Sequence, residues 1–459
     1  MTFQPGRLLV LMCATQFLNV ANISSVNLAL PDIATDLGFS GVTLSWVVSA
    51  YLLTFAGFLL VSARVADLVG RRKVLTAGLA IFAGCALLAA VAVNAEMLIA
   101  ARVVQGVGAA AAIPAALGIL TSTFTERAER SRAVAAFGGA GAVGFACGLI
   151  LGGVVTSPFG WRWVFGLTAA PAAVALALTI LLVPRDPPGG EAEGGVDVTG
   201  AITATAGLLG VVFGLTNAPR AGWASAATLI ALGGGIALLG AFVFVQRRVR
   251  DPLIPSGIWR RPNLAAVMAI GFCLFAAWVG ANFFLSLSLQ RVLGYSPTET
   301  AAALLPLAVG GLICTTLAGR LLPRVGPKPL LGAGLAVYAA GFALLASINA
   351  GTTYWPHILT AIVLAVAGNS VTFVASNVDA LAHARPDEQS LVGGLFNTAM
   401  QVGGVVGLAI MTAVAAALTE HQASGDALLT GYQAAFWTAA GIALIGVVVA
   451  VIFIHPERL

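Results

Sequence analysis

Long apolar stretches without charged residues recur along the whole chain, and each is close to the ~20 residues with which a helix crosses ~30 Å of hydrocarbon. Polar and apolar residues do not alternate within them, which argues against barrel strands, and an open sheet cannot satisfy its backbone in lipid. The first stretch is longer than a signal-peptide core and no polar domain follows it, so we expect it to be retained. The pattern therefore predicts an all-α membrane protein with fourteen transmembrane helices, approximately at 8–30, 44–62, 74–94, 97–120, 133–155, 163–183, 199–217, 224–246, 263–290, 301–318, 329–347, 355–377, 391–418 and 432–453.

Composition supports this prediction and narrows the chemistry. The chain is 59% hydrophobic and only 9% charged, whereas soluble domains are about one-quarter charged. Neither of the two lysines is followed by serine or threonine, which excludes a P-loop ATPase, and the four histidines lie far apart at or beyond span ends. The five cysteines all fall inside spans, so we expect no disulfide and no metal site. Because the histidines are too scattered to pair a base with a nucleophile, we expect no enzyme activity, and we expect no cofactor.

The basic residues fix an expected orientation, because short cytoplasmic loops are enriched in lysine and arginine. They are scattered over short loops rather than gathered on one domain, so we expect no nucleic-acid partner. The alanine-, glycine- and arginine-rich composition is typical of a bacterium with high G+C content, so we expect the bacterial cytoplasmic membrane as the location. We also expect the protein to be a monomer. The basic residues predict that both termini are cytoplasmic. This orientation makes nineteen of the 23 basic residues cytoplasmic: Arg7, Arg64, Arg71, Arg72, Lys73, Arg127, Arg130, Arg132, Arg185, Arg247, Arg248, Arg250, Arg260, Arg261, Arg320, Arg324, Lys328, Arg385 and Arg458.

Two loops resemble each other at a constant offset of 256 residues, one running from Ala63 to Leu79 and the other from Gly319 to Leu335. Transporters are often built from such repeated halves, with the substrate site between them. We therefore predict a six-helix bundle over residues 1–189, a linker with two inserted helices over 190–250, and a second six-helix bundle over 251–459.

Several motifs carry a resemblance to a known family. Residues 63–73 (ARVADLVGRRK) are similar to G-x-L-A-D-x-x-G-R-K without its leading glycine, and residues 102–110 (RVVQGVGAA) are similar to R-x-x-Q-G-x-G-A-A. Residues 44–51, Gly160-Trp161-Arg162-Trp163, 293–296 and 397–404 add further matches. The chain resembles the major facilitator superfamily, and within it the fourteen-helix drug:proton antiporters. The resemblance covers nearly the whole chain.

The charged motifs are the candidates for coupling and gating. A guanidinium inside a span costs at least ~2.5 kcal/mol unless it meets water or a partner, so we expect Arg102 to face the interior, with snorkelling to the nearby surface as the alternative. The resemblance implies proton coupling for Arg102, yet Asn22 stands where many relatives carry aspartate. Asp32, at the predicted outer end of the first helix, becomes the candidate partner of Arg102, or else is an ordinary helix-end carboxylate. Asp67 and Arg71 are expected to form a latch that shifts a conformational equilibrium, or else belong to a solvated loop.

Uncharged polar groups inside the spans are candidates for the substrate cavity, although each could instead join neighbouring helices. Because no carboxylate lies in the middle of a span, we expect neutral or anionic rather than permanently cationic substrates. The cavity candidates are Gln16, Asn19, Asn22, Trp46, Gln105, Trp278, Asn282, Asn369, Asn397 and Gln401.

Gly144, Gly148 and Gly152 follow one another at intervals of four and predict a smooth ridge for close helix packing. They resemble the antiporter motif G-x-x-x-G-P-x-x-G-G, with Leu149 in place of its proline, which weakens what the motif implies about antiport.

These features predict a secondary transporter with alternating access. The resemblance to the drug:proton antiporters implies that it exports small lipophilic compounds, such as a drug, antibiotic or metabolite, by proton antiport. A nutrient importer, and a lipid flippase or transport-dead receptor on the same scaffold, are the alternatives that the residues leave open.

Overall fold

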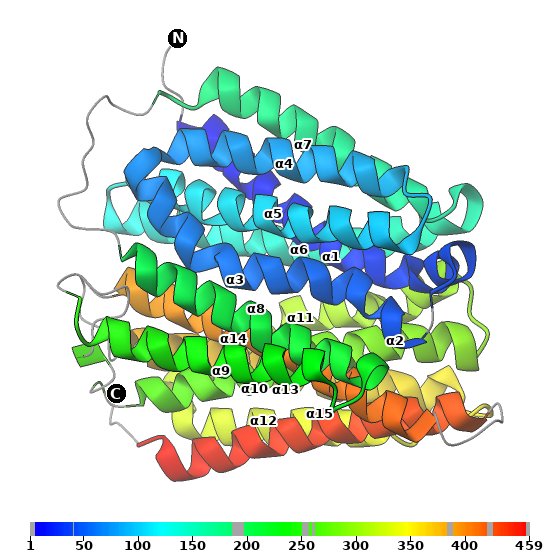
Figure 1. Ribbon diagram of the computed structural model, residues 1–459. Helices are drawn as coiled ribbons and strands as arrows, with labels where there is room; N and C mark the ends of the chain where they lie inside the picture. Colours follow the sequence, from blue (N-terminus) through cyan, green and yellow to red (C-terminus); the bar gives the residue numbers. More distant parts are fainter. Residues whose placement is uncertain are drawn as a thin grey trace. The chain divides into compact units, whose positions relative to one another are not determined.

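The structure is a computed structural model that describes residues 5–39, 41–185, 197–249, 257–258, 261, 263–382, 389–419 and 426–455. Fourteen long helices lie in these ranges, in agreement with the fourteen predicted spans (Figure 1). Thirteen are long and apolar enough to cross a membrane, and the remaining one, α3, contains the shorter apolar segment Trp46–Leu59. The chain is therefore a multi-pass membrane protein.

The helices follow the hydropathy pattern in order along the chain. A short helix, α2 (Gly41–Leu44), and two π-helical turns, η2 (Ser288–Val292) and η3 (Tyr354–Ile358), accompany the long ones. The long helices are α1 (Pro5–Leu37), α3 (Trp46–Val69), α4 (Arg71–Ala90), α5 (Ala95–Thr123), α6 (Arg127–Phe159), α7 (Arg162–Leu182), α8 (Val198–Ala221), α9 (Ala226–Gln246), α10 (Leu264–Leu287), α11 (Pro297–Val325), α12 (Pro327–Leu345), α13 (Leu359–Ala382), α14 (Gln389–Thr419) and α15 (Asp426–Phe453).

Some helices continue past their apolar stretch. The first was predicted to end near residue 30, but α1 runs through Pro31 to Leu37. Its 33 residues span ~50 Å at 1.5 Å per residue, more than the ~30 Å hydrocarbon core. Hydropathy marks only the segment of a helix that lies within the hydrocarbon core. Asp32 and Asp36 are helical residues beyond that segment.

The long helices fall into two compact units. The first contains α1, α3–α7, the beginning of α8 through Thr205, and Ser296–Ala302 at the start of α11; the second contains the remaining elements. α8 is thus shared between the units, with the hydroxyl of Thr205 donating to the Gly57 carbonyl of α3 at 2.6 Å. The three-part division by sequence, six plus two plus six helices, stays a prediction.

The sequence repeat has a structural counterpart inside each unit. Gly70 and Gly326, which are 256 residues apart, precede α4 and α12 with positive φ values of 113° and 82°, a conformation that favours glycine. In the first unit α4 meets α5 at Gly78 and Gly108; in the second, α12 meets α13 at Gly334 and Gly368. Each half therefore builds the same loop and helix crossing.

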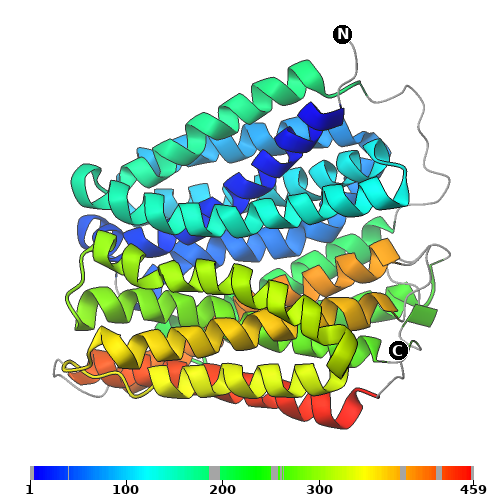
Figure 2. The same cartoon turned by 180° about the vertical axis from the view of Figure 1, so that it is seen from behind.

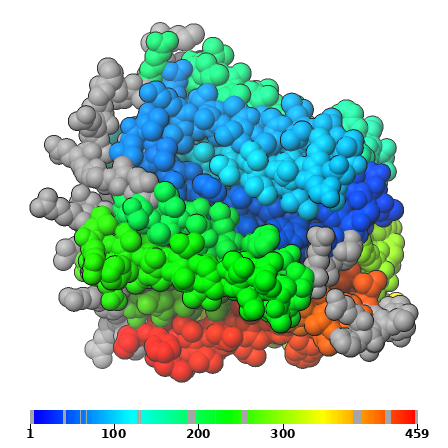
Figure 3. Space-filling model, viewed as in Figure 1, coloured from blue at the N-terminus to red at the C-terminus, as the bar shows by residue number. Residues whose placement is uncertain are grey.

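The two helices predicted to be an insertion, α8 and α9, pack on each other through small residues. Gly210 of α8 lies against Ala231 and Gly235 of α9, and a methyl group at Gly210 would approach the Ala231 carbonyl to 3.0 Å. The outer face of α9 is apolar and exposed, with Ile230 at 72% and Ile236 at 63% exposure. Figure 3 shows this green helix at the surface, where its side chains can face lipid.

Candidate functional site

Among the described residues of the first unit, the most buried charged side chain is that of Arg102, which is 1% exposed. It lies in α5, whose first turn is capped by the Asn94 side chain accepting from the Met97 amide at 2.8 Å. Arg102 is seven residues after the first residue of α5, which places it ~10 Å along the helix. The guanidinium faces the interior of the unit and does not snorkel to the surface.

Neutral groups surround this guanidinium on three helices. Arg102 Nη1 donates to Asn22 Oδ1 of α1 at 2.7 Å and to Gln105 Oε1 of its own helix at 2.8 Å. Its Nε donates to the Val47 carbonyl of α3 at 2.9 Å. In the part of the chain that the structure describes, every hydrogen-bond partner of Arg102 is therefore uncharged.

Aromatic rings complete the surroundings of Arg102. The guanidinium carbon lies 4.3 Å from the centre of the Tyr51 ring and 5.9 Å from that of Phe165, within cation–π range. The Tyr51 hydroxyl donates to Asn19 Oδ1, which connects this ring back to α1. Arg102, Asn19, Asn22, Tyr51 and Gln105 form one buried polar cluster, called the Arg102 cluster below.

The glycines that follow Arg102 explain how the cluster becomes so tight. Gly106 packs against Thr54 and the Tyr51 backbone of α3, where a side chain would collide, and Thr54 donates to the Val103 carbonyl at 2.8 Å. Gly108 packs against α4, where a methyl group would lie 2.8 Å from the Gly78 carbonyl. The R-x-x-Q-G-x-G pattern therefore places Arg102 and its acceptor Gln105 on one turn of α5. It places the two glycines that contact α3 and α4 on the next turn.

The predicted pairing of Arg102 with Asp32 is wrong, because Asn22 occupies the position beside the guanidinium. Asp32 follows Asn22 by ten residues on the same helix, which corresponds to ~15 Å. Asp32 is half-buried near the far end of α1. Any role of Asp32 in coupling must therefore be exerted away from Arg102.

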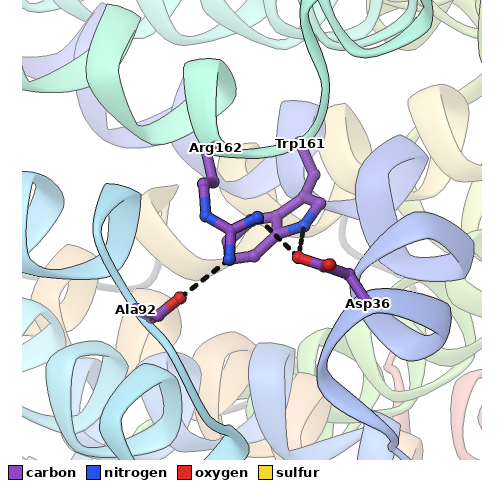
Figure 4. Close-up of polar contacts among 4 residues, drawn as sticks. All are labelled: Asp36, Ala92, Trp161 and Arg162. Atoms are coloured by element: carbon purple, nitrogen blue, oxygen red, sulfur yellow. Dashed lines mark hydrogen bonds and ion pairs between the residues drawn. The ribbon is translucent and has the colours of Figure 1, made fainter.

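A different carboxylate, Asp36, forms an ion pair at the end of α1, with Arg162 at the start of α7 (Figure 4). Trp161 Nε1 also donates to Asp36 at 3.0 Å, and Arg162 Nη2 donates to the Ala92 carbonyl after α4 at 3.1 Å. The side chains of Arg162 and Asp36 are 43% and 46% exposed, and exposed pairs contribute about 0–1 kcal/mol. This contact therefore connects three helix ends and explains the Trp-Arg part of the Gly160–Trp163 motif.

Toward the opposite end of these helices, two arginines donate to backbone carbonyls near the C-terminal ends of neighbouring helices. Arg71 Nη1 donates to the Gly118 carbonyl of α5, and Arg72 Nη2 to the Ile180 carbonyl of α7, both at 2.7 Å. Ile180 lies in the last turn of α7, where carbonyls lack intrahelical partners and a cation is favourable. The Gly118 carbonyl lies five residues before the end of α5 and also accepts from the Thr121 hydroxyl at 3.1 Å. The side chain of Asp67 lies outside the described residues, so its latch with Arg71 stays a prediction.

The remaining cavity candidates are distributed over both units. Gln16 and Trp46 are half-buried in the first unit, and Gln16 packs beside Gly141. In the second unit, Asn282 donates to the Trp278 carbonyl one turn earlier at 2.9 Å, which makes it partly satisfied by its own helix. A substrate cavity lined by both sets stays a prediction; the members in the second unit, all half-buried, are Trp278, Asn282, Asn369, Asn397 and Gln401.

The glycine ridge of α6 lies directly against α1. A methyl group at Gly144 would lie 2.5 Å from the Phe17 carbonyl, and one at Gly152 would lie 2.8 Å from Ser25 Cα. At Gly148 it would collide with the Ser24 hydroxyl. These glycines therefore allow the backbones of α1 and α6 to approach each other.

Sequence reasoning did not assign a role to Tyr51, Asp36 or Asp379. Asp379 of α13 is only 3% exposed, and buried carboxylates in membrane helices are often functional. Its position near a span end was visible in the sequence, but its burial was not. Among the described residues, no group of three histidine, cysteine or acidic side chains could hold a metal ion.

Fourteen long apolar helices, with a buried cationic cluster inside the first unit, define the class as a polytopic membrane protein. The family model of the Major Facilitator Superfamily matches residues 12–408 and 267–459, and the chain belongs to this superfamily. It is 36% identical to the puromycin resistance protein of Streptomyces alboniger over 98% of this chain and 91% of the relative. It is also 36% identical to the cephamycin export protein of Amycolatopsis lactamdurans, over 97% and 91% of the respective chains.

The fold is shared with solved transporters of distant sequence. A bacterial homologue of the human lysosomal transporter Spinster, in an inward-facing and occupied conformation, matches with a TM-score of 0.71 at 17% identity. The match covers 98% of this chain and 97% of that one. This likeness concerns the fold alone.

Proposed function

We propose that this protein is a secondary active exporter of small lipophilic compounds in a bacterial cytoplasmic membrane. The observation that carries the proposal is its likeness, over 97–98% of its length, to the puromycin resistance and cephamycin export proteins. The protein acts as a monomer. Both of its termini lie in the cytoplasm, and the distribution of its basic residues supports this orientation.

The Arg102 cluster supports a preference for neutral or anionic substrates. It contains a guanidinium but no carboxylate, so it repels a permanent cation and favours hydrogen-bond acceptors. The side-chain nitrogens of Asn22 and Gln105 have no hydrogen-bond partner among the described residues, which leaves buried donors beside the guanidinium. An acceptor-rich compound would satisfy such donors when the cluster opens.

Proton antiport is the proposed mode of energy coupling. Arg102 supports it through the family resemblance, with Asp67 and Arg71 as the proposed latch between conformations. Asn22 cannot carry a proton, so the proton must bind elsewhere. Asp32 and the buried Asp379 are the two carboxylates proposed for that step.

Export is tested by measuring the cellular accumulation of a panel of labelled compounds, puromycin among them, in cells that express the chain. Expression should lower accumulation of at least one compound several-fold, and Arg102→Gln should abolish the effect because it removes the buried charge. Arg248→Gln, at an exposed arginine after α9, serves as the matched control and should export normally. Unchanged accumulation of the whole panel, or increased accumulation as in an importer, would refute the proposal.

Coupling is tested separately with purified protein in liposomes that contain a substrate of the panel. An imposed pH gradient should drive its movement, and Asp32→Asn or Asp379→Asn should remove the response to the gradient. Proton antiport is rejected if transport is the same with and without the gradient.

A further inference from the structure

A groove of about 890 Å³ runs along the surface of the first unit, between α1, α6 and α7. Figure 2 shows the dark-blue α1 from behind, between α6 and α7. Along α1 the groove extends from Gly6 to Ser25, which are nineteen residues or ~28 Å apart on a helix. The groove is therefore nearly as long as the ~30 Å hydrocarbon core, longer than one leaflet.

The walls of this groove are suited to a hydrocarbon chain. Large apolar side chains line it while remaining accessible, including Val10 at 68%, Leu151 at 46% and Val174 at 58% exposure. Its two hydroxyl groups are already used, because Ser25 donates to the Asn22 carbonyl at 3.3 Å and Thr168 to the Val164 carbonyl at 2.8 Å. A ligand inside the groove thus meets almost no free polar group.

The charge at one end of the groove selects the ligand's head group. Among the described residues that line the groove, Arg7 is the only charged one, and it lies in the first turn of α1, where the apolar stretch begins. An exposed arginine at the edge of a membrane span attracts the phosphates of anionic lipids, with ~1 kcal/mol for each basic residue. The apolar walls and the terminal cation together match the two parts of a phospholipid.

We propose that this groove binds one acyl chain of an anionic phospholipid, with the lipid phosphate at Arg7. The lipid comes from the leaflet in which the N-terminal end of α1 lies. The site is formed by three helices of one unit, and it is independent of the Arg102 cluster and of the substrate.

The experiment uses the full chain reconstituted in liposomes that contain a phospholipid with a photoactivatable group in its acyl chain. Phosphatidylglycerol is the anionic probe, phosphatidylcholine is the zwitterionic probe, and labelled residues are mapped by peptide mass spectrometry. The anionic probe should label α1 and α7 residues of the groove about five-fold more than the zwitterionic probe, the ratio that corresponds to ~1 kcal/mol.

Two pairs of variants test the two halves of the proposal. Arg7→Gln should make the two probes equal, whereas Arg132→Gln, at an exposed arginine of α6 that does not line the groove, should keep the preference. Ala170→Trp fills the groove and should reduce labelling several-fold, whereas Ala173→Trp, also exposed on α7 but not in the groove, should not.

Labelling of the unmodified protein is enough to overturn the proposal, so the test does not depend on the folding of any variant. Equal labelling by both probes, or labels spread evenly over all lipid-facing helices, would reject it. Displacement of the probe by an exported compound would instead identify the groove as a substrate site and would also reject it.

Discussion

At the scale of single residues, Arg102 shows how a membrane interior can hold a charge with neutral partners. Three hydrogen bonds and the Tyr51 ring surround the guanidinium. Hydrogen bonds to charged groups contribute ~1.5–3 kcal/mol each, which is comparable in sum with the cost of burying the charge. The cluster is therefore stable without a carboxylate, and its net charge remains positive.

We expect Asn22→Asp to change the charge preference of export. The new carboxylate would lie where Asn22 Oδ1 accepts from Arg102, now at 2.7 Å, and would neutralise the cluster. Export of a permanently cationic dye relative to a neutral substrate should rise about ten-fold, the factor that corresponds to ~1.4 kcal/mol. The measurement compares efflux rates of the two compounds from preloaded cells.

Asn27→Asp provides the control for this change, because Asn27 is on the same helix but does not bond Arg102. It should leave the ratio of the two efflux rates near that of the unmodified protein. An equal rise in both variants would mean that the general charge of α1, rather than the Arg102 cluster, sets the preference.

The sequence favoured a position for Arg102 inside the protein, because a charge within an apolar span is costly unless it meets water or a partner, and it left snorkelling to the surface as the alternative. It was not sufficient to identify the partner. A search for opposite charge led to Asp32. The position of Asn22 beside Arg102, however, depends on how α1 and α5 pack against each other. That relation between helices is not encoded in residue spacing along either one.

At the scale of helices, hydropathy was an accurate guide to number and order but not to length. Each span was visible because lipid requires a continuous apolar surface. α1 continues to Leu37 beyond the hydrocarbon core, where an apolar surface is no longer required. This extra segment of α1 brings Asp36 to Arg162. Contacts at helix ends are therefore the part of this fold that sequence patterns describe least well.

The packing of α1 on α6 should be sensitive to a single methyl group at the centre of the glycine ridge. Gly148→Ala would collide with the Ser24 hydroxyl and approach the Ala21 carbonyl to 2.5 Å, and overpacking of this kind costs ~1–3 kcal/mol. We expect a lower midpoint in a thermal series read by size-exclusion chromatography of the detergent-purified protein.

Gly139→Ala is the matched change on the same helix, because no other atom lies within 4 Å of a methyl group there. Alanine has a higher helix propensity than glycine by up to ~1 kcal/mol, so the midpoint should stay unchanged or rise. A midpoint for Gly148→Ala that is equal to that of Gly139→Ala would show that the ridge does not limit the approach of α1.

At the scale of the whole molecule, the two halves repeat the same construction. The turns at Gly70 and Gly326 and the helix crossings at Gly78 and Gly334 keep their 256-residue offset. The pair α8 and α9, predicted to be an insertion, lies between these two repeats in sequence. An even number of inserted helices leaves the direction of the second half in the membrane unchanged, which is why the charged loops of both halves are predicted to face the cytoplasm.

The ends of α9 offer a direct measurement of this orientation. In a variant whose five native cysteines are replaced, we expect Ala224→Cys to react with a membrane-impermeant maleimide on intact cells. Arg247→Cys, at the other end of α9, should react only after the membrane is permeabilised. Both positions are exposed, so access by the reagent is not limited by packing. Labelling in the opposite order would reverse the predicted orientation of the whole chain.

The uncompensated charge of Arg102 has an electrical consequence. An elementary charge that crosses a potential of 100 mV changes its free energy by ~2.3 kcal/mol. Arg102 lies within a membrane-spanning helix and its partners among the described residues are all neutral. Any displacement of α5 along the membrane normal therefore moves net charge through the field, so the resting voltage of the cell itself favours one conformation of the first unit over another.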